Sequence, residues 1–160
     1  MVARRSAPKP KAIVGWREWV ALTELGGAVV KAKVDTGART SAIHAYRIST
    51  YESDGLTIAR FQIHPVQKRK RPVLAVEAPV VDRRHVRSSN GSVEERLVVR
   101  TPIEMGQHRF SIDLTLTNRD EMGFRMLLGR SALKRRFLVD PGRSYVTGRP
   151  AEDSETAAGS

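Results

Sequence analysis

Hydrophobic and polar residues alternate along two segments of the chain. Ala28–Val34 and Phe110–Thr117 place apolar side chains at every second position, with mostly polar residues between them. This period of two predicts half-buried β-strands. Weaker strand signals cover six further segments, which are Glu18–Leu22, Leu56–His64, Val73–Ala78, Glu94–Arg100, Met126–Gly129 and Ser144–Thr147.

Turn residues separate these segments, and evidence for helices is sparse. Asp54-Gly55 and Asn90-Gly91 are typical of tight turns between strands. The sequence predicts one short helix, Ser131–Phe137, with Ser131 as its N-cap. Many short strands joined by glycine turns favour an all-β barrel or sandwich. The interval Gln67–Arg87 is expected to contain an insertion, with a solvated basic loop at its start.

The pattern predicts one folded domain, residues 13–148. Residues 1–12 are basic and contain proline, and residues 149–160 are small and polar, so we expect both ends to be flexible, disordered tails. A total of 160 residues suits a single domain. The sequence shows neither a long apolar run nor a secretory signal, which favours a cytoplasmic location and no contact with membranes.

Charge and cysteine content narrow the chemistry. The chain carries 28 Lys and Arg against 17 Asp and Glu, a formal net charge of +11. Such an excess attracts polyanions such as nucleic acids or acidic protein tails. The chain contains no cysteine, which excludes disulfides, thiol catalysis and cysteine-based zinc sites.

One segment has the residues expected of a catalytic loop. Asp35-Thr36-Gly37-Ala38 follows directly on the clearest strand, so the carboxylate of Asp35 would be held at a strand end. A carboxylate in this position is suited to activating water, but one ordinary aspartate is a weak base at neutral pH. Two carboxylates in contact share a proton and can act as an acid and base pair. The sequence contains only one Asp-Thr-Gly.

This loop, together with Leu127-Leu128-Gly129-Arg130, resembles the retropepsin-like aspartic peptidases. The resemblance is more specific in four further stretches, which are Val14–Trp19, Ala32–Ala45, Val86–Gly91 and Leu116–Arg130. These are similar to a bacterial RimB-type family that is also labelled ATP-dependent zinc protease. The similarity covers about Val14 to Val146 and implies a retropepsin-like closed β-barrel.

The resemblance also implies roles for individual residues. Retropepsins complete their site across a two-fold axis, so we expect a homodimer in which Asp35 faces Asp35 of the partner. Thr36 would hydrogen-bond across the dimer, and Gly37 would let the backbone approach the carboxylate. By the same pattern, Ala38, Leu128, Gly129 and Arg130 would support the loop without contacting substrate.

The substrate is expected to be acidic. Arg39 stands where viral retropepsins usually have an acidic residue, which makes the local field more positive. A hairpin around Ser88, Ser89, Asn90 and Gly91 is the candidate flap, and Arg83, Arg87 and Arg96 beside it could bind carboxylates. The resemblance further implies a link to RimK, a ligase that adds glutamates to a ribosomal protein. Trimming of such tails is therefore the expected activity.

Two alternatives remain open at this point. The chain could be a non-catalytic regulator that binds the ribosome or RNA through non-specific phosphate contacts. It could instead be a zinc hydrolase, although His44, His64, His85 and His108 are scattered and lack ligand spacing. The chain has no phosphate-binding loop motif, and we expect neither a metal nor another cofactor.

Overall fold

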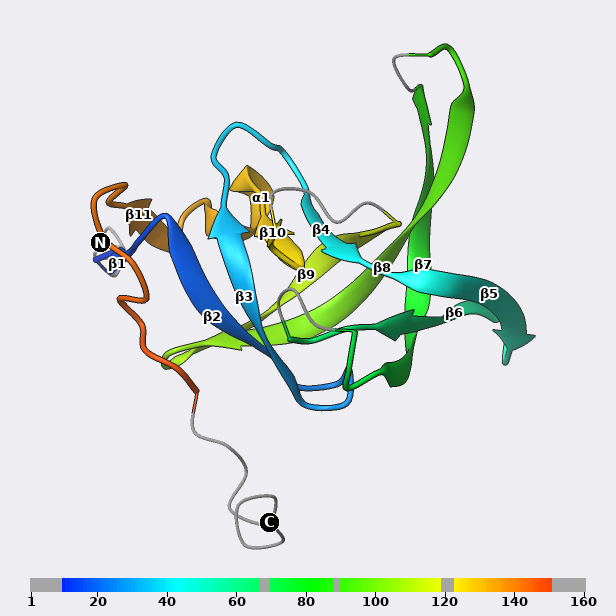
Figure 1. Ribbon diagram of the computed structural model, residues 1–160, viewed down its shortest axis with the longest axis horizontal. Coiled ribbons are helices and arrows are strands. Elements are labelled where there is room, and N and C mark those ends of the chain that lie inside the picture. The colour runs from blue at the N-terminus through cyan, green and yellow to red at the C-terminus, as the bar shows by residue number, and fades with distance from the viewer. Residues whose placement is uncertain (1–9, 67–69, 88–89, 119–122, 151–160) are drawn as a thin grey trace, which may run out of the picture.

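The chain folds almost entirely into β-strands (Figure 1). This computed structural model describes residues 10–66, 70–87, 90–118 and 123–150. Residues 1–9 and 151–160, which make up most of the two predicted tails, lie outside the described residues. In chain order the elements are β1 (Ala12–Val14), β2 (Arg17–Leu22), β3 (Ala28–Val34), β4 (Ser41–His44), β5 (Tyr46–Ser53), β6 (Leu56–Ile63), β7 (Leu74–Arg87), β8 (Val93–Met105), β9 (His108–Thr117), β10 (Met126–Leu128), α1 (Arg130–Leu133) and β11 (Phe137–Val139).

Six of the strands form a closed barrel. They follow one another in the order β2, β3, β10, β4, β9 and β8, and β8 returns to β2 through the pairing of Ala21 with Glu104. β7, β6 and β5 continue the sheet beyond β8, on the right of Figure 1. Closure satisfies the backbone groups that an open sheet would leave at its edges. The all-β barrel predicted from the sequence is therefore confirmed.

The alternating segments supply the barrel core. In β3, Val30 and Ala32 are fully buried, whereas Lys31 and Lys33 between them are only partly covered. In β9, Leu114 and Leu116 are buried in the same way. Burial of such side chains is the main stabilising contribution to a fold of this size. The period of two thus identified both the strands and the side that faces inward.

Two short strands form a separate parallel sheet at the left of Figure 1. β1 pairs only with β11, and Ile13 stands directly opposite Leu138. These two side chains are 44% and 55% exposed. Parallel sheets are normally covered on both faces, so an exposed apolar pair here is unusual.

β7 is a long strand that changes its partner halfway along. It pairs with β6 over Leu74–Pro79 and with β8 from Val80 onward. The register steps from Val80 opposite Val99 to Asp82 opposite Val98, which leaves Val81 as the extra residue of a bulge. Beyond the bulge, β7 and β8 form a hairpin that projects from the barrel (Figure 1). Much of the predicted insertion is therefore this strand.

Most of the other strand predictions match a strand of the structure. The weaker signals correspond to β2, β6, β7, β8 and β10, although β7 and β8 extend much further than expected. The sequence reading did not find β1, β4, β5 or β11. Seven of the eight residues of β5 are exposed, so this strand lacks the apolar alternation on which the reading relied.

Two element predictions were wrong. The helix is Arg130–Leu133 rather than Ser131–Phe137, and its N-cap is Gly129, without a side-chain cap. It ends at Leu133 because Lys134 leaves the helical conformation with a ψ of 133°, and Arg135 follows with a φ of 72°. The described part of the chain contains no helix that could cross a membrane.

The predicted strand Ser144–Thr147 is a loop held by a buried carboxylate. Glu18 is 0% exposed. Its Oε2 accepts hydrogen bonds from the backbone N–H groups of Gly15 (2.7 Å) and Val146 (2.9 Å). Its Oε1 accepts from the backbone N–H (3.0 Å) and the hydroxyl (2.9 Å) of Thr147. The side chain thus takes the place of a partner strand, which is why the alternation at Ser144–Thr147 was misleading.

We expect the substitution Glu18→Gln to lower the free energy of unfolding by about 3 kcal/mol, because an amide NH2 would face backbone donors and leave them unpaired. Urea denaturation would measure this as a lower midpoint at an unchanged slope. Glu52→Gln is the control, since the exposed Glu52 accepts one surface hydrogen bond from Thr57. Equal midpoints for the two variants would contradict a structural role for Glu18.

Candidate active site

The loop that carries Asp35 wraps around the end of another strand. β10 lies between β3 and β4, parallel to β3 and antiparallel to β4. The loop from β3 to β4 therefore has to pass over the end of β10. The backbone N–H of Asp35 donates to the carbonyl of Leu128 at 2.8 Å. This contact places the aspartate where the two parallel strands end.

The carboxylate of Asp35 is oriented by its own loop. The backbone N–H of Gly37 donates to Oδ1 of Asp35 at 2.9 Å. A Cβ added at Gly37 would lie 3.1 Å from the same oxygen, so any larger residue would crowd the carboxylate. Asp35 is half-buried, whereas Thr36 and Gly37 are exposed. The carboxylate is thus fixed in direction yet accessible.

Residues after β10 hold the rest of the loop. The backbone N–H groups of Arg130 and Ser131 donate to the carbonyls of Ala38 (2.7 Å) and Arg39 (3.0 Å). The guanidinium of Arg130 also donates to the carbonyl of Thr36 at 3.0 Å. Three carbonyl groups of the loop, those of Thr36, Ala38 and Arg39, are therefore tied to the segment that follows β10.

Gly129 permits the closest approach in this arrangement. Its N–H donates to the hydroxyl of the buried Ser41 at 3.1 Å. A Cβ at this position would lie 2.5 Å from the carbonyl carbon and oxygen of Thr40, which no side chain could tolerate. The structure therefore brings Asp35–Ala38 together with Leu128, Gly129 and Arg130, as the sequence reading expected.

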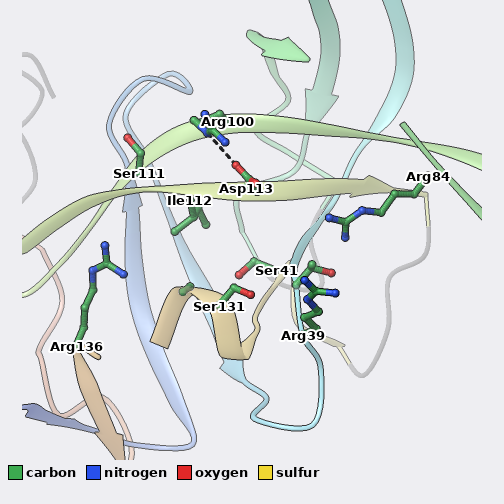
Figure 2. Close-up of a pocket in the computed structure, with 11 residues that line it drawn as sticks. Arg39, Ser41, Arg84, Arg100, Ser111, Ile112, Asp113, Ser131 and Arg136 are labelled. Atoms are coloured by element: carbon green, nitrogen blue, oxygen red, sulfur yellow. Dashed lines mark hydrogen bonds and ion pairs between the residues drawn. The ribbon is translucent and has the colours of Figure 1, made fainter. Parts of the chain in front are cut away.

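An arginine-lined cavity of about 460 Å³ opens beside this loop (Figure 2). Arg39 reaches it from the loop, Arg84 from β7 and Arg136 from the segment after α1. The remaining lining residues are Thr40, Ser41, Arg100, Ser111, Ile112, Asp113, Ser131 and Ala132. Of the predicted substrate-binding residues that the structure describes, only Arg39 lies here.

The three additional arginines of this cavity differ in their partners. Arg100 donates to Asp113 at 2.9 Å, and this hydrogen bond raises the pKa of Arg100 above its ordinary value. Arg136 stacks over the ring of Phe110 at 4.2 Å. Arg84 makes a 3.3 Å ion pair with Asp82. Alternation along β7 could have indicated Arg84, but only the fold shows that Arg100 and Arg136 line the same cavity.

A second cavity, of about 700 Å³, lies on the other side of Arg39. Thr36 contributes to it, as does the exposed Leu138 of β11. Most of its other lining residues are basic or apolar, and the full set is Lys11, Arg130, Ser131, Leu133, Lys134, Arg135, Phe137 and Val139, with Arg39 shared between the two cavities. The Asp35 loop and the β1–β11 sheet therefore border one continuous surface.

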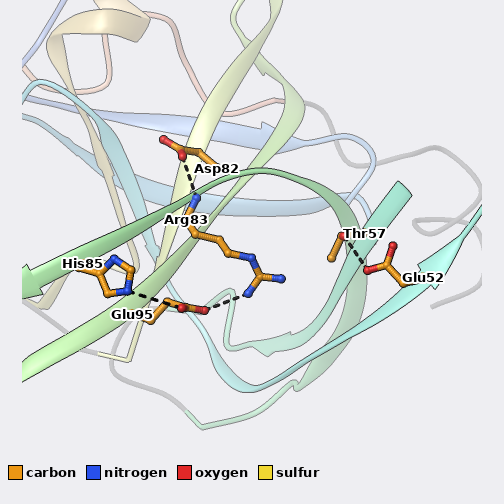
Figure 3. Close-up of polar contacts among 6 residues, drawn as sticks. All are labelled: Glu52, Thr57, Asp82, Arg83, His85 and Glu95. Atoms are coloured by element: carbon orange, nitrogen blue, oxygen red, sulfur yellow. Dashed lines mark hydrogen bonds and ion pairs between the residues drawn. The ribbon is translucent and has the colours of Figure 1, made fainter. Parts of the chain in front are cut away.

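The projecting hairpin divides its arginines between two faces. Arg83 pairs with Glu95 at 2.9 Å, and His85 approaches the same carboxylate at 3.7 Å (Figure 3). Arg84 stands opposite Arg96 on the other face. The predicted residues Arg83 and Arg96 therefore do not act on the same side of the strand pair.

The predicted flap is only partly described. Arg87 is the exposed last residue of β7, and Ser88 and Ser89 lie outside the described residues. The side-chain oxygen of Asn90 accepts from the N–H of Ser92 at 3.1 Å. Gly91 has a φ of 86°, a conformation that favours glycine. These contacts define a turn, and the flap role stays a prediction.

The histidines do not assemble a metal site in the described structure. No group of three or more His, Cys, Asp or Glu side chains in this part of the chain is placed to hold a metal ion. His64 stacks on Tyr46, with ring centroids 4.6 Å apart. His44 lies next to this pair, and its ring centroid is 6.4 Å from that of His64.

We expect Gly129→Ala to destabilise the protein by about 3 kcal/mol or more, because the added methyl group would overlap the backbone of Thr40. Urea denaturation of wild type and variant would measure the loss. Gly142→Ala is the matched control, since its Cβ would meet only Asp140 at an ordinary 3.4 Å. A Gly129→Ala protein as stable as this control would contradict the close contact.

Comparison with known proteins is consistent with this geometry. Curated relatives named "Probable alpha-L-glutamate ligase" come from Shewanella halifaxensis (46% identity over 139 residues), Desulfotalea psychrophila (43% over 144) and Parasynechococcus marenigrum (44% over 143). The alignments cover 87%, 90% and 89% of this chain. The chain spans only 30 to 31% of the length of these relatives.

A solved structure and a family model complete the comparison. The crystal structure of a Legionella pneumophila protein of unknown function superposes with a TM-score of 0.73 and 29% identity. The match covers 86% of this chain and 99% of that one. The model of the RimB-like family, described as "Retropepsin-like aspartic endopeptidase RimB", matches residues 13–150. With its barrel and its Asp-Thr-Gly loop wrapped around β10, the chain belongs to the RimB-like family of retropepsin-like aspartic endopeptidases.

Proposed function

We propose that this protein is an aspartic peptidase whose active site is completed by a second copy of the chain. The observation that carries the proposal is the single accessible carboxylate of Asp35, which Gly37 orients at 2.9 Å. One carboxylate is a weak catalyst for water attack, whereas two in contact share a proton and divide the roles of base and acid. A two-fold axis beside the Asp35 loop would supply the second carboxylate.

In this mechanism the two Asp35 side chains hold a water molecule between them. The ionised carboxylate takes a proton from the water while the water oxygen attacks the scissile carbonyl carbon. The protonated carboxyl group donates its proton to the carbonyl oxygen. Breakdown of the tetrahedral intermediate releases an amine and a carboxylic acid.

The β1–β11 sheet is the surface that we assign to the dimer. Each of its strands has one partner among the described residues, and Ile13 and Leu138 are exposed side by side in register. The cavity that Leu138 lines also includes Thr36. A second copy docked on this surface would cover the apolar pair and approach the Asp35 loop at once.

We propose that the substrate is an acidic peptide. A net charge of +11 favours encounter with such a substrate. The relatives named as glutamate ligases contain a segment similar to this chain within a longer protein. This association supports glutamate-rich tails, of the kind that a RimK-type ligase adds to a ribosomal protein, as the substrate to test first. The ligase and the ribosome are the corresponding candidate partners.

The basic cavity also favours a second candidate function, which is a non-catalytic regulator that binds RNA. Arginines bind phosphate as well as they bind carboxylate. In that case Asp35 would have only a structural role, and substitution of Asp35 would not affect the function.

We expect Asp35→Asn to reduce hydrolysis of a glutamate-tailed peptide by about a thousandfold or more, because an amide cannot act as a general base. Mass spectrometry of the products would measure the rate, with and without a chelator. Asp54→Asn is the control, since Asp54 lies in a turn with a φ of 50° that asparagine also adopts. Equal activity of the Asp35→Asn and Asp54→Asn proteins would refute the dyad. If a chelator abolishes hydrolysis while Asp35→Asn does not, the protein would be a metal hydrolase.

We expect Leu138→Glu to raise the dimer dissociation constant by at least about tenfold, because it places a charge in the proposed apolar contact. Sedimentation equilibrium would measure the constant, and the specific activity should fall in parallel at low protein concentration. Leu56→Glu is the control, as Leu56 is 59% exposed in the β5–β6 hairpin. A wild-type protein that stays monomeric at high concentration would contradict the shared site.

A further inference from the structure

Two arginines face each other across the projecting hairpin. Arg84 of β7 and Arg96 of β8 are directly paired in register. Like charges in such cross-strand positions are destabilising. The arrangement therefore needs a compensating negative charge.

Each arginine of this pair has one carboxylate partner in the hairpin. Asp82 lies 3.3 Å from Arg84, and Glu94 only 3.9 Å from Arg96. The side chain of Arg96 is 18% exposed, and its Nε atom is buried without a hydrogen-bond partner. Arg96 does not line the arginine-lined cavity, so the case for a ligand there rests on Arg84 and the other lining residues.

Arg84 also faces the cavity beside the catalytic loop. Figure 2 shows Arg84 and Arg39 extending toward the same space from β7 and from the loop, with Arg136 at the opposite end. Ser41 and Ser131 add hydroxyl groups to the lining. Four arginines and one aspartate line this cavity, so it carries a net positive charge.

We infer that this cavity is a carboxylate-binding subsite in which Arg39 and Arg84 select an acidic side chain of the peptide. The inference rests on the proposed peptidase function, because it assigns the cavity to a residue near the scissile bond. Arg39 lies four positions after Asp35 in the same loop, so a peptide crossing the loop can place a side chain here. Guanidinium groups bind carboxylates in bidentate fashion.

The shape of the cavity favours a peptide over a nucleic acid. It lies between β9 and α1 (Figure 2), and the carboxylate of Asp113 interrupts its basic lining. A nucleic-acid backbone needs a continuous basic groove that follows successive phosphates. A single pocket beside the loop suits one side chain rather than a run of successive phosphates.

Binding of a fluorescein-labelled oligo-glutamate peptide tests the inference. The measurement uses the full chain with Asp35→Asn as background, so that the peptide is not cleaved during fluorescence anisotropy titration. We expect Arg39→Gln and Arg84→Gln each to raise the dissociation constant by about tenfold, the effect of losing one charged hydrogen bond. An oligo-glutamine peptide should bind weakly to every variant.

Two further arginine variants separate a specific subsite from general charge. Arg60→Gln removes the same charge and a comparable exposed ion pair, that between Arg60 and Glu77 at 2.9 Å, and should change the dissociation constant less than twofold. Arg83 lies next to Arg84 in the sequence but on the opposite face of β7, so Arg83→Gln is the second control variant. An effect of Arg83→Gln equal to or larger than that of Arg84→Gln would overturn the inference.

Hydrolysis assays distinguish failure of the subsite from failure of the proposed function. If Asp35-dependent cleavage of the glutamate peptide is unchanged by Arg84→Gln, the protein is a peptidase and the subsite is wrong. If binding depends on Arg84 but no cleavage occurs, the subsite stands and the peptidase proposal fails. If a single-stranded RNA oligonucleotide binds more tightly than the peptide with the same dependence on Arg84, the cavity is a phosphate site and the inference is overturned.

Discussion

The passage of β10 between β3 and β4 is the constraint on which the candidate site depends. Gly129 lies so close to the backbone of Thr40, at the end of the Asp35 loop, that a Cβ there would overlap it. Backbone hydrogen bonds to Leu128, Arg130 and Ser131 fix the loop along its length. Such preorganisation lets a carboxylate keep its direction without being buried. The site is therefore built from segments distant in sequence but adjacent in the sheet.

The same strands that hold the Asp35 loop also supply the surfaces around it. β4 begins at Ser41, which accepts a hydrogen bond from Gly129 and also lines the arginine-lined cavity. Arg39 borders both cavities beside the loop. One short segment thus connects the carboxylate, the cavity proposed to bind an acidic side chain and the surface proposed to bind a second copy. Changes in this segment would affect all three.

The sequence was sufficient for features that depend on local chemistry. Alternation identified β3 and β9, and the position of Asp-Thr-Gly after β3 indicated the loop. Elements whose stability comes from distant partners could not be found in this way. The loop at Ser144–Thr147 is held by Glu18, a residue more than a hundred positions earlier, and a local pattern contains no trace of that contact. Arg136 lines the cavity from the segment after the four-residue α1, where the sequence predicted a longer helix.

The bulge at Val81 decides which arginine belongs to which face of the hairpin. Alternation along an uninterrupted β7 would place residue 83 opposite residue 96, because Val80 pairs with Val99. The extra residue shifts the register by one, so that Arg84 takes that position and Arg83 turns to Glu95. A single inserted residue can therefore exchange the side chains presented to a ligand while leaving the strand, its length and its charge almost unchanged. Variation at such a bulge would offer this fold a short route to new specificity.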